Sequence, residues 1–216
     1  MESSTMTPVG ARAVDAQTVA EAFRRTAANH PDVVAVRTAD DNISLTWAEL
    51  LSRVDAVAGG LAQLGVKRGD TVAIMLGNRP EFHIADLAAV TLGATPFSIY
   101  TTYPAPEIEF LCTDAGVSVA IVEQAFLPVV LKARENLPGL EHVIVIDGDA
   151  PEGTIPLADV EGSNPDFDAA AASAQAGPED IALLRRAELE RLFGPAQPER
   201  MGPLVKSWTC VRPPQP

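Results

Sequence analysis

The chain has 216 residues, 47% of them hydrophobic, and a formal net charge of −13. This length and composition suit one folded domain, or a large part of one, and argue against disorder throughout. A chain with this negative net charge has no overall basic surface for binding phosphate backbones, so we expect no nucleic acid as a partner.

The sequence carries no targeting or metal-binding signal. Its first ten residues contain no basic segment followed by an apolar run, and no later stretch is apolar for long enough to span a bilayer. We therefore expect a cytoplasmic protein with no integral membrane segment. Cys112 and Cys210 are far apart and have no CxxC spacing, so they predict neither a disulfide framework nor a zinc site.

The first predicted elements are a helix and a hairpin. Thr18 and Glu21 have the spacing of a capping box, and apolar residues then recur at helical intervals as far as Pro31. Residues 33–37 and 43–45 are extended apolar segments on either side of an Asp-Asp-Asn cluster. This pattern predicts a β-hairpin.

A longer amphipathic helix comes next. Thr46 and Glu49 form a second capping box, and Gly65 supplies the C-terminal stop. One apolar stripe runs along this helix through Leu50, Val54, Val57, Leu61 and Leu64. The stripe predicts that the helix packs against a core.

From residue 67 onward the sequence repeats a unit of strand, loop and helix. The predicted strands are residues 71–76, 95–99, 117–122 and 142–147, and the predicted helices begin at Pro80, after Pro106 and near residue 126. The strands are continuously apolar and do not alternate with polar residues. Such strands, separated by helices, predict an α/β fold with a mainly parallel sheet and helices on both faces.

After Asp147 the sequence becomes rich in Ala, Gly, Pro and acidic residues, which predicts a surface loop or linker. Ile181–Leu184 is apolar and predicts the start of another buried strand. The tail, residues 185–216, differs abruptly. Six basic residues against three acidic ones give it a net charge of +3, whereas the first 184 residues carry −16. We expect this tail to be poorly ordered.

Four short motifs occur in a characteristic order. They are Thr46, Trp47, Glu49 and Leu50; then Gly69 and Asp70 before TVAIML; then Asn78, Pro80 and Glu81; and then Leu92, Gly93 and Ala94. In this order they resemble the opening of the adenylate-forming enzymes, which include acyl-CoA synthetases, luciferases and peptide-synthetase adenylation domains. The stretch IYTTYPAPEIEFLCTDAG, from Ile99 to Gly116, resembles the long-chain fatty acyl-CoA ligases more than the peptide-synthetase branch.

The resemblance covers residues 18–184 and implies a partial N-terminal domain, an early subdomain of the adenylate-forming fold. Residues 1–17 are then a flexible N-terminus and residues 185–216 a divergent tail. The resemblance also implies a reaction, in which ATP and a long-chain fatty acid give an acyl adenylate and pyrophosphate, with Mg²⁺, and the acyl group then passes to CoA.

The groups that this chemistry needs are missing from the sequence. In the family, a loop rich in Gly, Ser and Thr and carrying a Lys holds the ATP phosphates, and it follows the strand that Ile181–Leu184 resembles. Arg185 stands in that place, and neither this loop, a Walker-type loop nor GxGxxG occurs in the chain. We therefore nominate no catalytic, cofactor-binding or metal-binding residue. We expect the chain to bind none of ATP, Mg²⁺ and CoA and to be inactive alone.

Individual polar residues have structural interpretations. Tyr100–Tyr103 supply hydroxyls at the carboxyl end of a predicted strand, where ligands of open α/β sheets bind, but turn chemistry explains them. The remaining candidates are interpreted as helix-surface, boundary or turn residues: His30, His83, His142, Glu107, Glu109, Asp114 and residues 67–70.

Two further functions stay open at this point. One is a noncatalytic α/β interaction module that contacts a partner such as an intact ligase, or a second copy through an exposed sheet edge. The other is a binding domain for a nucleotide or an acyl group. Saturable binding to a defined partner without turnover distinguishes the first, and calorimetric titration with ATP or a fatty acid tests the second.

We predict that residues 185–216 come from another reading frame, or from a deletion that joined distant coding stretches, because the resemblance and the charge both change at Leu184. The DNA beyond the Leu184 codon, read in all frames, should then encode a stretch like Thr-Ser-Gly-Thr-Thr-Gly. If no frame encodes such a stretch, the frameshift explanation is wrong and a deletion remains.

Overall fold

The computed structural model describes residues 13–148, 150–178 and 180. All of them belong to the first of two compact units, which ends at Ala182. The expected strand at Ile181–Leu184, the tail that follows it, Cys210 and the first twelve residues lie outside the described residues. Within the described ranges, no helix has the length and apolar content needed to cross a membrane.

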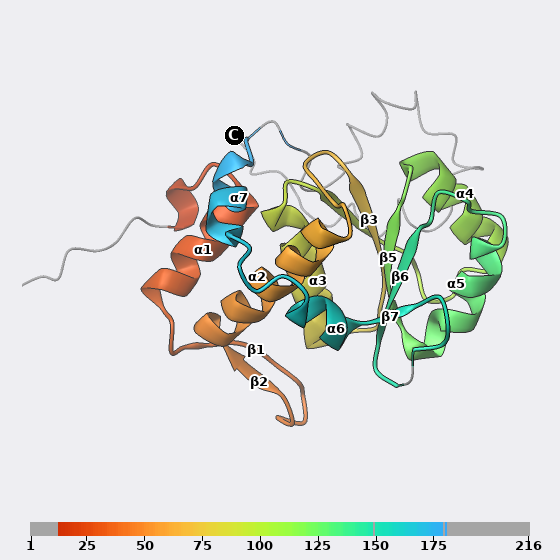
Figure 1. The fold of residues 1–216 in the computed structure, drawn as a ribbon. Helices are drawn as coiled ribbons and strands as arrows, with labels where there is room; N and C mark the ends of the chain where they lie inside the picture. Colours follow the sequence, from red (N-terminus) through yellow and green to blue (C-terminus); the bar gives the residue numbers. More distant parts are fainter. Residues whose placement is uncertain (1–12, 149, 179, 181–216) are drawn as a thin grey trace, which may run out of the picture. The chain divides into compact units, whose positions relative to one another are not determined.

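Helices and strands alternate along the chain much as the sequence predicts (Figure 1). The opening elements are η1 (Ala13–Asp15), α1 (Val19–Asn29), β1 (Val34–Arg37), β2 (Ser44–Thr46) and α2 (Trp47–Gln63). Next come β3 (Thr71–Met75), α3 (Pro80–Thr91), β4 (Thr95–Ser98), α4 (Ala105–Ala115), β5 (Val119–Glu123), η2 (Gln124–Phe126), α5 (Leu127–Arg134) and β6 (His142–Ile146). The last elements are β7 (Ile155–Pro156), α6 (Leu157–Gly162) and α7 (Ala169–Gln175).

Five strands form one parallel sheet in the order β4-β3-β5-β6-β7, and β1 and β2 form a separate antiparallel hairpin. From β3 the chain moves to one side for β4 and then crosses to the other side for β5. Helix α3 makes the first connection and α4 the second. This reversal makes the carboxyl ends of β3 and β5 the topological switch point of the sheet, the place where ligands of open α/β sheets usually bind.

Helices cover both faces of the sheet, which explains the continuous apolar strands. On one face, Val72 and Ile74 of β3 share a core with buried residues of α2, α3 and α6. On the other face, Ala73 and Met75 share a second core with α4 and α5. Successive residues of β3 thus point into different cores, as the two-residue period of a strand requires. Figure 1 shows α2, α3 and α6 on one side of the strands and α4 and α5 on the other.

Both predicted helix starts are confirmed, with one difference in detail. Thr46 and Glu49 make the full capping box, in which each side chain accepts the other's backbone N–H. Thr18 accepts the N–H of Glu21 at 3.1 Å, but the Glu21 carboxylate accepts the N–H of Gln17 instead of that of Thr18. The carboxylate still satisfies a free donor at the helix start, so α1 begins where the sequence predicts.

The segment after β6 corrects the prediction of a loop or linker. It contains β7, α6 and α7. Leu157 and Val160 of α6 are buried in the core beside α2 and α3, and Phe167 packs against the same core. Gly, Pro and acidic residues separate these few apolar positions, so no local periodicity marks the helices. Packing against the rest of the fold stabilises them instead.

Strand β4 is one edge of the sheet within the described part of the chain, and β7 is the other. The N–H groups of Thr95 and Ile99 donate toward β3, each at 2.8 Å. Successive residues of a strand point their backbone N–H and C=O groups to opposite sides. The backbone groups of Pro96 and Ser98 therefore face away from β3. Proline has no N–H to offer a further strand, so Pro96 blunts this edge. Self-association through the sheet edge, which stays a prediction, has to overcome this obstacle.

Helix α2 approaches α6 closely at a pair of glycines. A Cβ atom on Gly60 would lie 2.2 Å from the carbonyl oxygen of Val160, and one on Gly59 would lie 3.0 Å from that of Asn164. The Asn164 side chain donates a hydrogen bond to the Gly59 carbonyl at 3.2 Å. Glycine is unfavourable inside a helix, and here the close approach of two backbones requires it.

Replacing Gly60→Ala should lower the free energy of unfolding by about 1–3 kcal/mol, because overpacking against backbone outweighs the gain in helix propensity. Gly162→Ala is the matched control, since its Cβ would meet nothing within 4 Å. The control should leave stability unchanged or raise it. Urea denaturation of both variants measures the difference, and equal stability of Gly60→Ala and the original chain would contradict the close approach.

Candidate functional site

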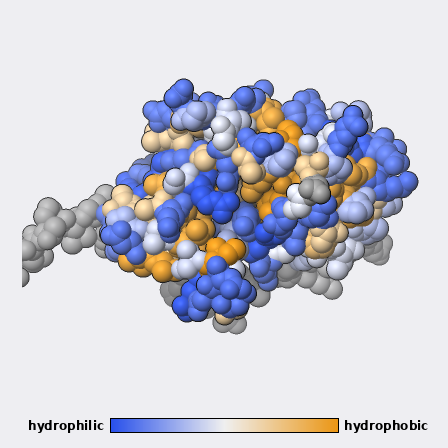
Figure 2. Space-filling view, turned by 60° about the horizontal axis from the view of Figure 1, so that its bottom comes forward, coloured by the Kyte–Doolittle hydropathy of each residue, from blue (hydrophilic) through white to orange (hydrophobic). Residues whose placement is uncertain are grey.

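The carboxyl ends of three strands meet at an ionic cluster. The guanidinium of Arg79, in the loop after β3, donates from Nε to Glu81 at 2.7 Å and from Nη2 to Asp147 at 2.9 Å. Its Nη1 also donates to Asp147 and lies 3.8 Å from a Glu123 carboxylate oxygen. We call Arg79, Glu81, Glu123 and Asp147 the carboxyl-edge cluster. Figure 2, which brings the lower end of the view in Figure 1 forward, shows hydrophobic areas that lie between hydrophilic ones on that face.

The cluster ties together β3, β5 and β6. Glu123 ends β5, and its carboxylate accepts the backbone N–H of Gly77, which follows β3, at 2.8 Å. Asp147 follows β6 directly and reaches Arg79 across β5. The loops at the topological switch point are therefore held by side-chain contacts between segments 46 and 68 residues apart in sequence.

Asp147 has an unusual backbone, with φ of +70°. Few residues other than glycine adopt this left-handed conformation, and Asp is among those that tolerate it. The hydrogen bonds from Arg79 lower the pKa of the Asp147 carboxyl, and the same contacts raise the pKa of the Arg79 guanidinium above its ordinary value. The ion pair is therefore fully charged at neutral pH.

The carboxyl-edge cluster is unsuited to binding an anion. Three carboxylates surround one guanidinium and leave a surplus of two negative charges, which repels phosphate. The carboxylates do not make a metal site either, because among the described residues no three His, Cys, Asp or Glu side chains are grouped so as to hold a metal ion. What the cluster can do is fix the loops of the switch point.

The structure places the other polar residues named in the sequence analysis in loops, on helix surfaces and, for His142, at the start of β6. Tyr100 and Tyr103 follow β4 and stack edge to face, with ring centroids 5.5 Å apart. His83 is exposed in the first part of α3, and the acidic side chains of α4 lie on its outer surface or half-buried beside α5. Arg79 is not among the candidates predicted from the sequence. The sequence feature that could have indicated it is its position in the Asn-Arg-Pro-Glu motif, between a predicted strand and the start of a predicted helix.

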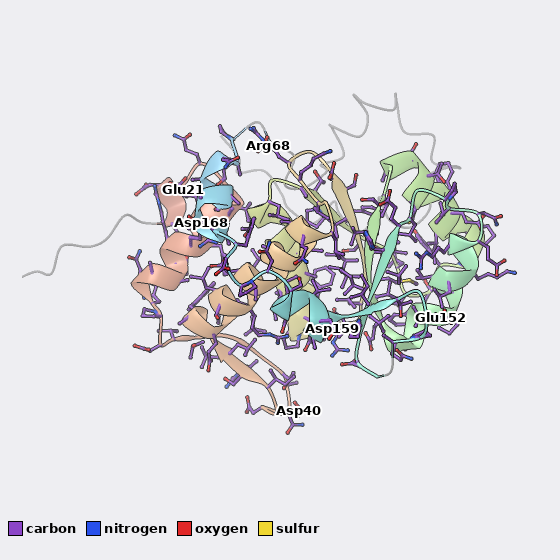
Figure 3. The ribbon with its side chains drawn as sticks, viewed as in Figure 1. Glu21, Asp40, Arg68, Glu152, Asp159 and Asp168 are labelled. Atoms are coloured by element: carbon purple, nitrogen blue, oxygen red, sulfur yellow. The ribbon has the colours of Figure 1, made fainter. Side chains whose placement is uncertain are left out.

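The turn at residues 67–70 lies at the opposite, amino edge of the sheet. Arg68 donates to both carboxylate oxygens of Asp180, at 2.7–3.0 Å, and Asp180 also accepts the N–H of Gly177 at 2.8 Å. Figure 3 labels Arg68 at the end of the molecule remote from Asp40 in the β1–β2 hairpin. These contacts attach the segment after α7 to the turn, which supports the structural interpretation of the turn.

Cys112 is buried in α4, and burial raises the pKa of its thiol to about 11. A thiol with this pKa is almost wholly protonated at neutral pH, whereas the thiolate is the reactive form. The prediction that Cys112 has no chemical role fits this environment.

The family of AMP-binding enzymes matches residues 23–185, so the chain belongs to that family. Uncharacterized protein Rv1549 of Mycobacterium tuberculosis is 43% identical over 134 residues, which cover 62% of this chain and 75% of that protein. Long-chain-fatty-acid–CoA ligase FadD13 of the same species is 30% identical over 119 residues, or 54% of this chain and 24% of the ligase. The crystal structure of the anthranilate CoA ligase AuaEII with anthranoyl-AMP aligns with a TM-score of 0.68 and 29% identity, over 81% of this chain and 32% of that one.

The chain thus spans most of Rv1549 but about a third or less of the ligases that it matches. The family includes acyl-CoA synthetases, among them the acetyl-coenzyme A synthetases of Candida glabrata and Methanothrix thermoacetophila. Among the described residues, the Arg79 guanidinium at the carboxyl edge is paired with carboxylates, and no three His, Cys, Asp or Glu side chains are grouped so as to hold a metal ion.

We predict that Asp147→Asn destabilises the fold at neutral pH, by about 1 kcal/mol or less because the ion pair is partly exposed. Asparagine tolerates the same backbone, so the variant isolates the charge. The folded-state pKa of Asp147 is depressed, so its stabilisation is present above its unfolded pKa near 3.9 and disappears as pH falls through the folded value.

Urea denaturation of the original chain and Asp147→Asn at pH 7 and near pH 3 tests this. The difference should be present at pH 7 and smaller near pH 3. Asp166→Asn, at an exposed carboxylate, is the control and should show no such pH-dependent difference. A difference for Asp147→Asn that is as large near pH 3 as at pH 7 would contradict the ionic explanation.

Proposed function

We propose that this chain supplies the N-terminal part of a long-chain fatty acid–CoA ligase and that it does not form an acyl adenylate alone. The motifs from Ile99 to Gly116 support this branch, and FadD13 is one of the relatives that the chain resembles. In the reaction of the parent enzyme, ATP and the fatty acid give the acyl adenylate, and CoA then accepts the acyl group.

One observation supports the proposal that the chain is inactive alone. At the switch point, where an open α/β sheet would present a cation to phosphates, the Arg79 guanidinium is bound by Glu81 and Asp147 and lies beside Glu123. Together with the missing Gly-, Ser- and Thr-rich loop, this leaves Arg79 unavailable to stabilise the charge that develops at the α-phosphate of ATP as the carboxylate attacks and pyrophosphate departs. The described domain then contributes a scaffold, in which the parallel sheet and the loops at its carboxyl edge are held in place, while other segments of the parent enzyme supply the catalytic groups.

A noncatalytic interaction module is the second candidate. The similarity to Rv1549 favours it, because the match covers 75% of that protein and leaves little of it outside the shared part. A protein of this extent would act by binding a partner such as an intact ligase. Saturable binding of the purified chain to FadD13, without any change in pyrophosphate release, would support this function.

The proposed inactivity is tested by measuring pyrophosphate release from the purified full chain with ATP, Mg²⁺ and palmitate. We expect no release above a heat-inactivated sample, while FadD13 assayed in parallel serves as the positive control. Palmitate-dependent release that co-purifies with the chain, and is absent from a mock purification, would show that the chain is an active enzyme.

A further inference from the structure

Asp147 and Gly148 form the only Asp-Gly pair in the sequence, and the sequence contains no Asn-Gly pair. An aspartyl residue followed by glycine isomerises without an enzyme, because glycine has no Cβ atom to shield its backbone nitrogen from the neighbouring carboxyl group. Both residues follow β6 directly and are exposed to solvent. The pair is therefore a candidate site of covalent modification, next to Arg79 in the carboxyl-edge cluster.

The fold itself favours this pair of residues. Asp147 has φ of +70° and Gly148 has φ of +63°, so both lie in the left-handed region. A Cβ atom on Gly148 would also lie 3.2 Å from Cδ of Gln124, so both conformation and space favour glycine at this position. Besides glycine, Asp and Asn tolerate the left-handed region best, and the guanidinium of Arg79 favours the charged one of the two at residue 147.

The isomerisation has two steps. The lone pair of the Gly148 nitrogen attacks Cγ of the protonated Asp147 carboxyl, the N–Cγ bond forms, and the carboxyl OH leaves as water with the proton of the Gly148 N–H. The product is a five-membered succinimide. A water molecule then adds to the main-chain carbonyl carbon of Asp147, and the bond from that carbon to the Gly148 nitrogen breaks. The chain now runs through Cγ, and the new carboxylate releases the proton that the original carboxylate had taken up.

Arg79 opposes this reaction in the folded chain. Its Nη1 and Nη2 groups donate to different oxygens of the Asp147 carboxylate, so the carboxylate cannot turn freely toward the Gly148 nitrogen. The same hydrogen bonds lower the pKa of the Asp147 carboxyl. They therefore keep the group ionised, whereas the first step needs its protonated form.

We propose that Asp147–Gly148 is a site of spontaneous isoaspartate formation, and that the two hydrogen bonds from Arg79 restrain the reaction while the fold is intact. The isoaspartyl product has one more backbone atom, and its carboxylate is attached directly to Cα. This carboxylate no longer lies where Arg79 binds it, so the modification releases the loop after β6 from the loop after β3. The inference rests on the carboxyl-edge cluster and is independent of the proposed function.

Incubation of the purified full chain at neutral pH and physiological temperature tests the proposal. Proteolysis after Glu141 and Glu152 releases residues 142–152, and electron-transfer fragmentation of this peptide measures the isoaspartyl fraction at residue 147. The chain unfolded in guanidinium chloride should accumulate isoaspartate, and the folded chain should do so more slowly. Arg79→Gln should accumulate it several-fold faster than the original folded chain.

Arg53→Gln is the matched control, because Arg53 also donates to a carboxylate, that of Glu161 at 2.7 Å, from a different part of the fold. This variant loses a comparable ion pair and should leave the rate at Asp147 unchanged. Thermal melting of each variant establishes that the fold is retained. If Arg79→Gln does not fold, Arg79→Lys takes its place, because lysine keeps the charge but lacks the two-pronged geometry.

Three outcomes would overturn the proposal. One is an unfolded chain that forms no isoaspartate at residue 147, which would show that the pair is not reactive. Another is a folded Arg79 variant that reacts no faster than the original chain, which would remove the restraint by Arg79. The third is an Arg53→Gln variant that reacts as fast as the Arg79 variant, which would attribute the effect to general loosening of the fold.

Discussion

Burial of β3 on both of its faces is the constraint on which the rest of the fold depends. Its residues Val72 to Met75 are almost wholly buried, and they alternate between two separate cores. A strand of this kind needs helices on both faces of the sheet. Because crossovers between parallel strands are right-handed, both faces are covered only when the next strand lies on one side of β3 and the strand after that lies on its other side. The position of the switch point, and hence of the loops that meet there, follows from this one requirement.

Much of the fold could be predicted because its signals are local. The capping residue Thr46, the left-handed Gly65 after α2 and the uninterrupted apolar strands each act within a few residues, so the sequence pattern reports them directly. The helices after β6 could not be predicted in this way. Val160 of α6 and Phe167, between α6 and α7, are apolar positions with polar neighbours, and the core that they meet is far away in sequence.

The carboxyl-edge cluster escaped prediction for a related reason. Arg79 and Glu81 are neighbours in a recognisable motif, but Glu123 and Asp147 stand at the ends of other strands, and nothing in their local sequence marks them as partners. The general rule for open α/β sheets predicts the place where they meet. Whether such a place binds a ligand depends on its balance of charge, which here is decided by residues from three separate loops.

The glycine pair in α2 has a consequence for the order in which the chain folds. With 17 residues α2 is the longest helix described, yet two adjacent glycines in its interior weaken it as an isolated helix. Its compensating contacts come from α6 and Asn164, 105 residues after Gly59 in the case of the side-chain hydrogen bond. Contacts of such long sequence separation form late, because the intervening loop must close first. During synthesis, α2 therefore emerges long before the segment that stabilises it, and its final packing waits for almost the whole described unit.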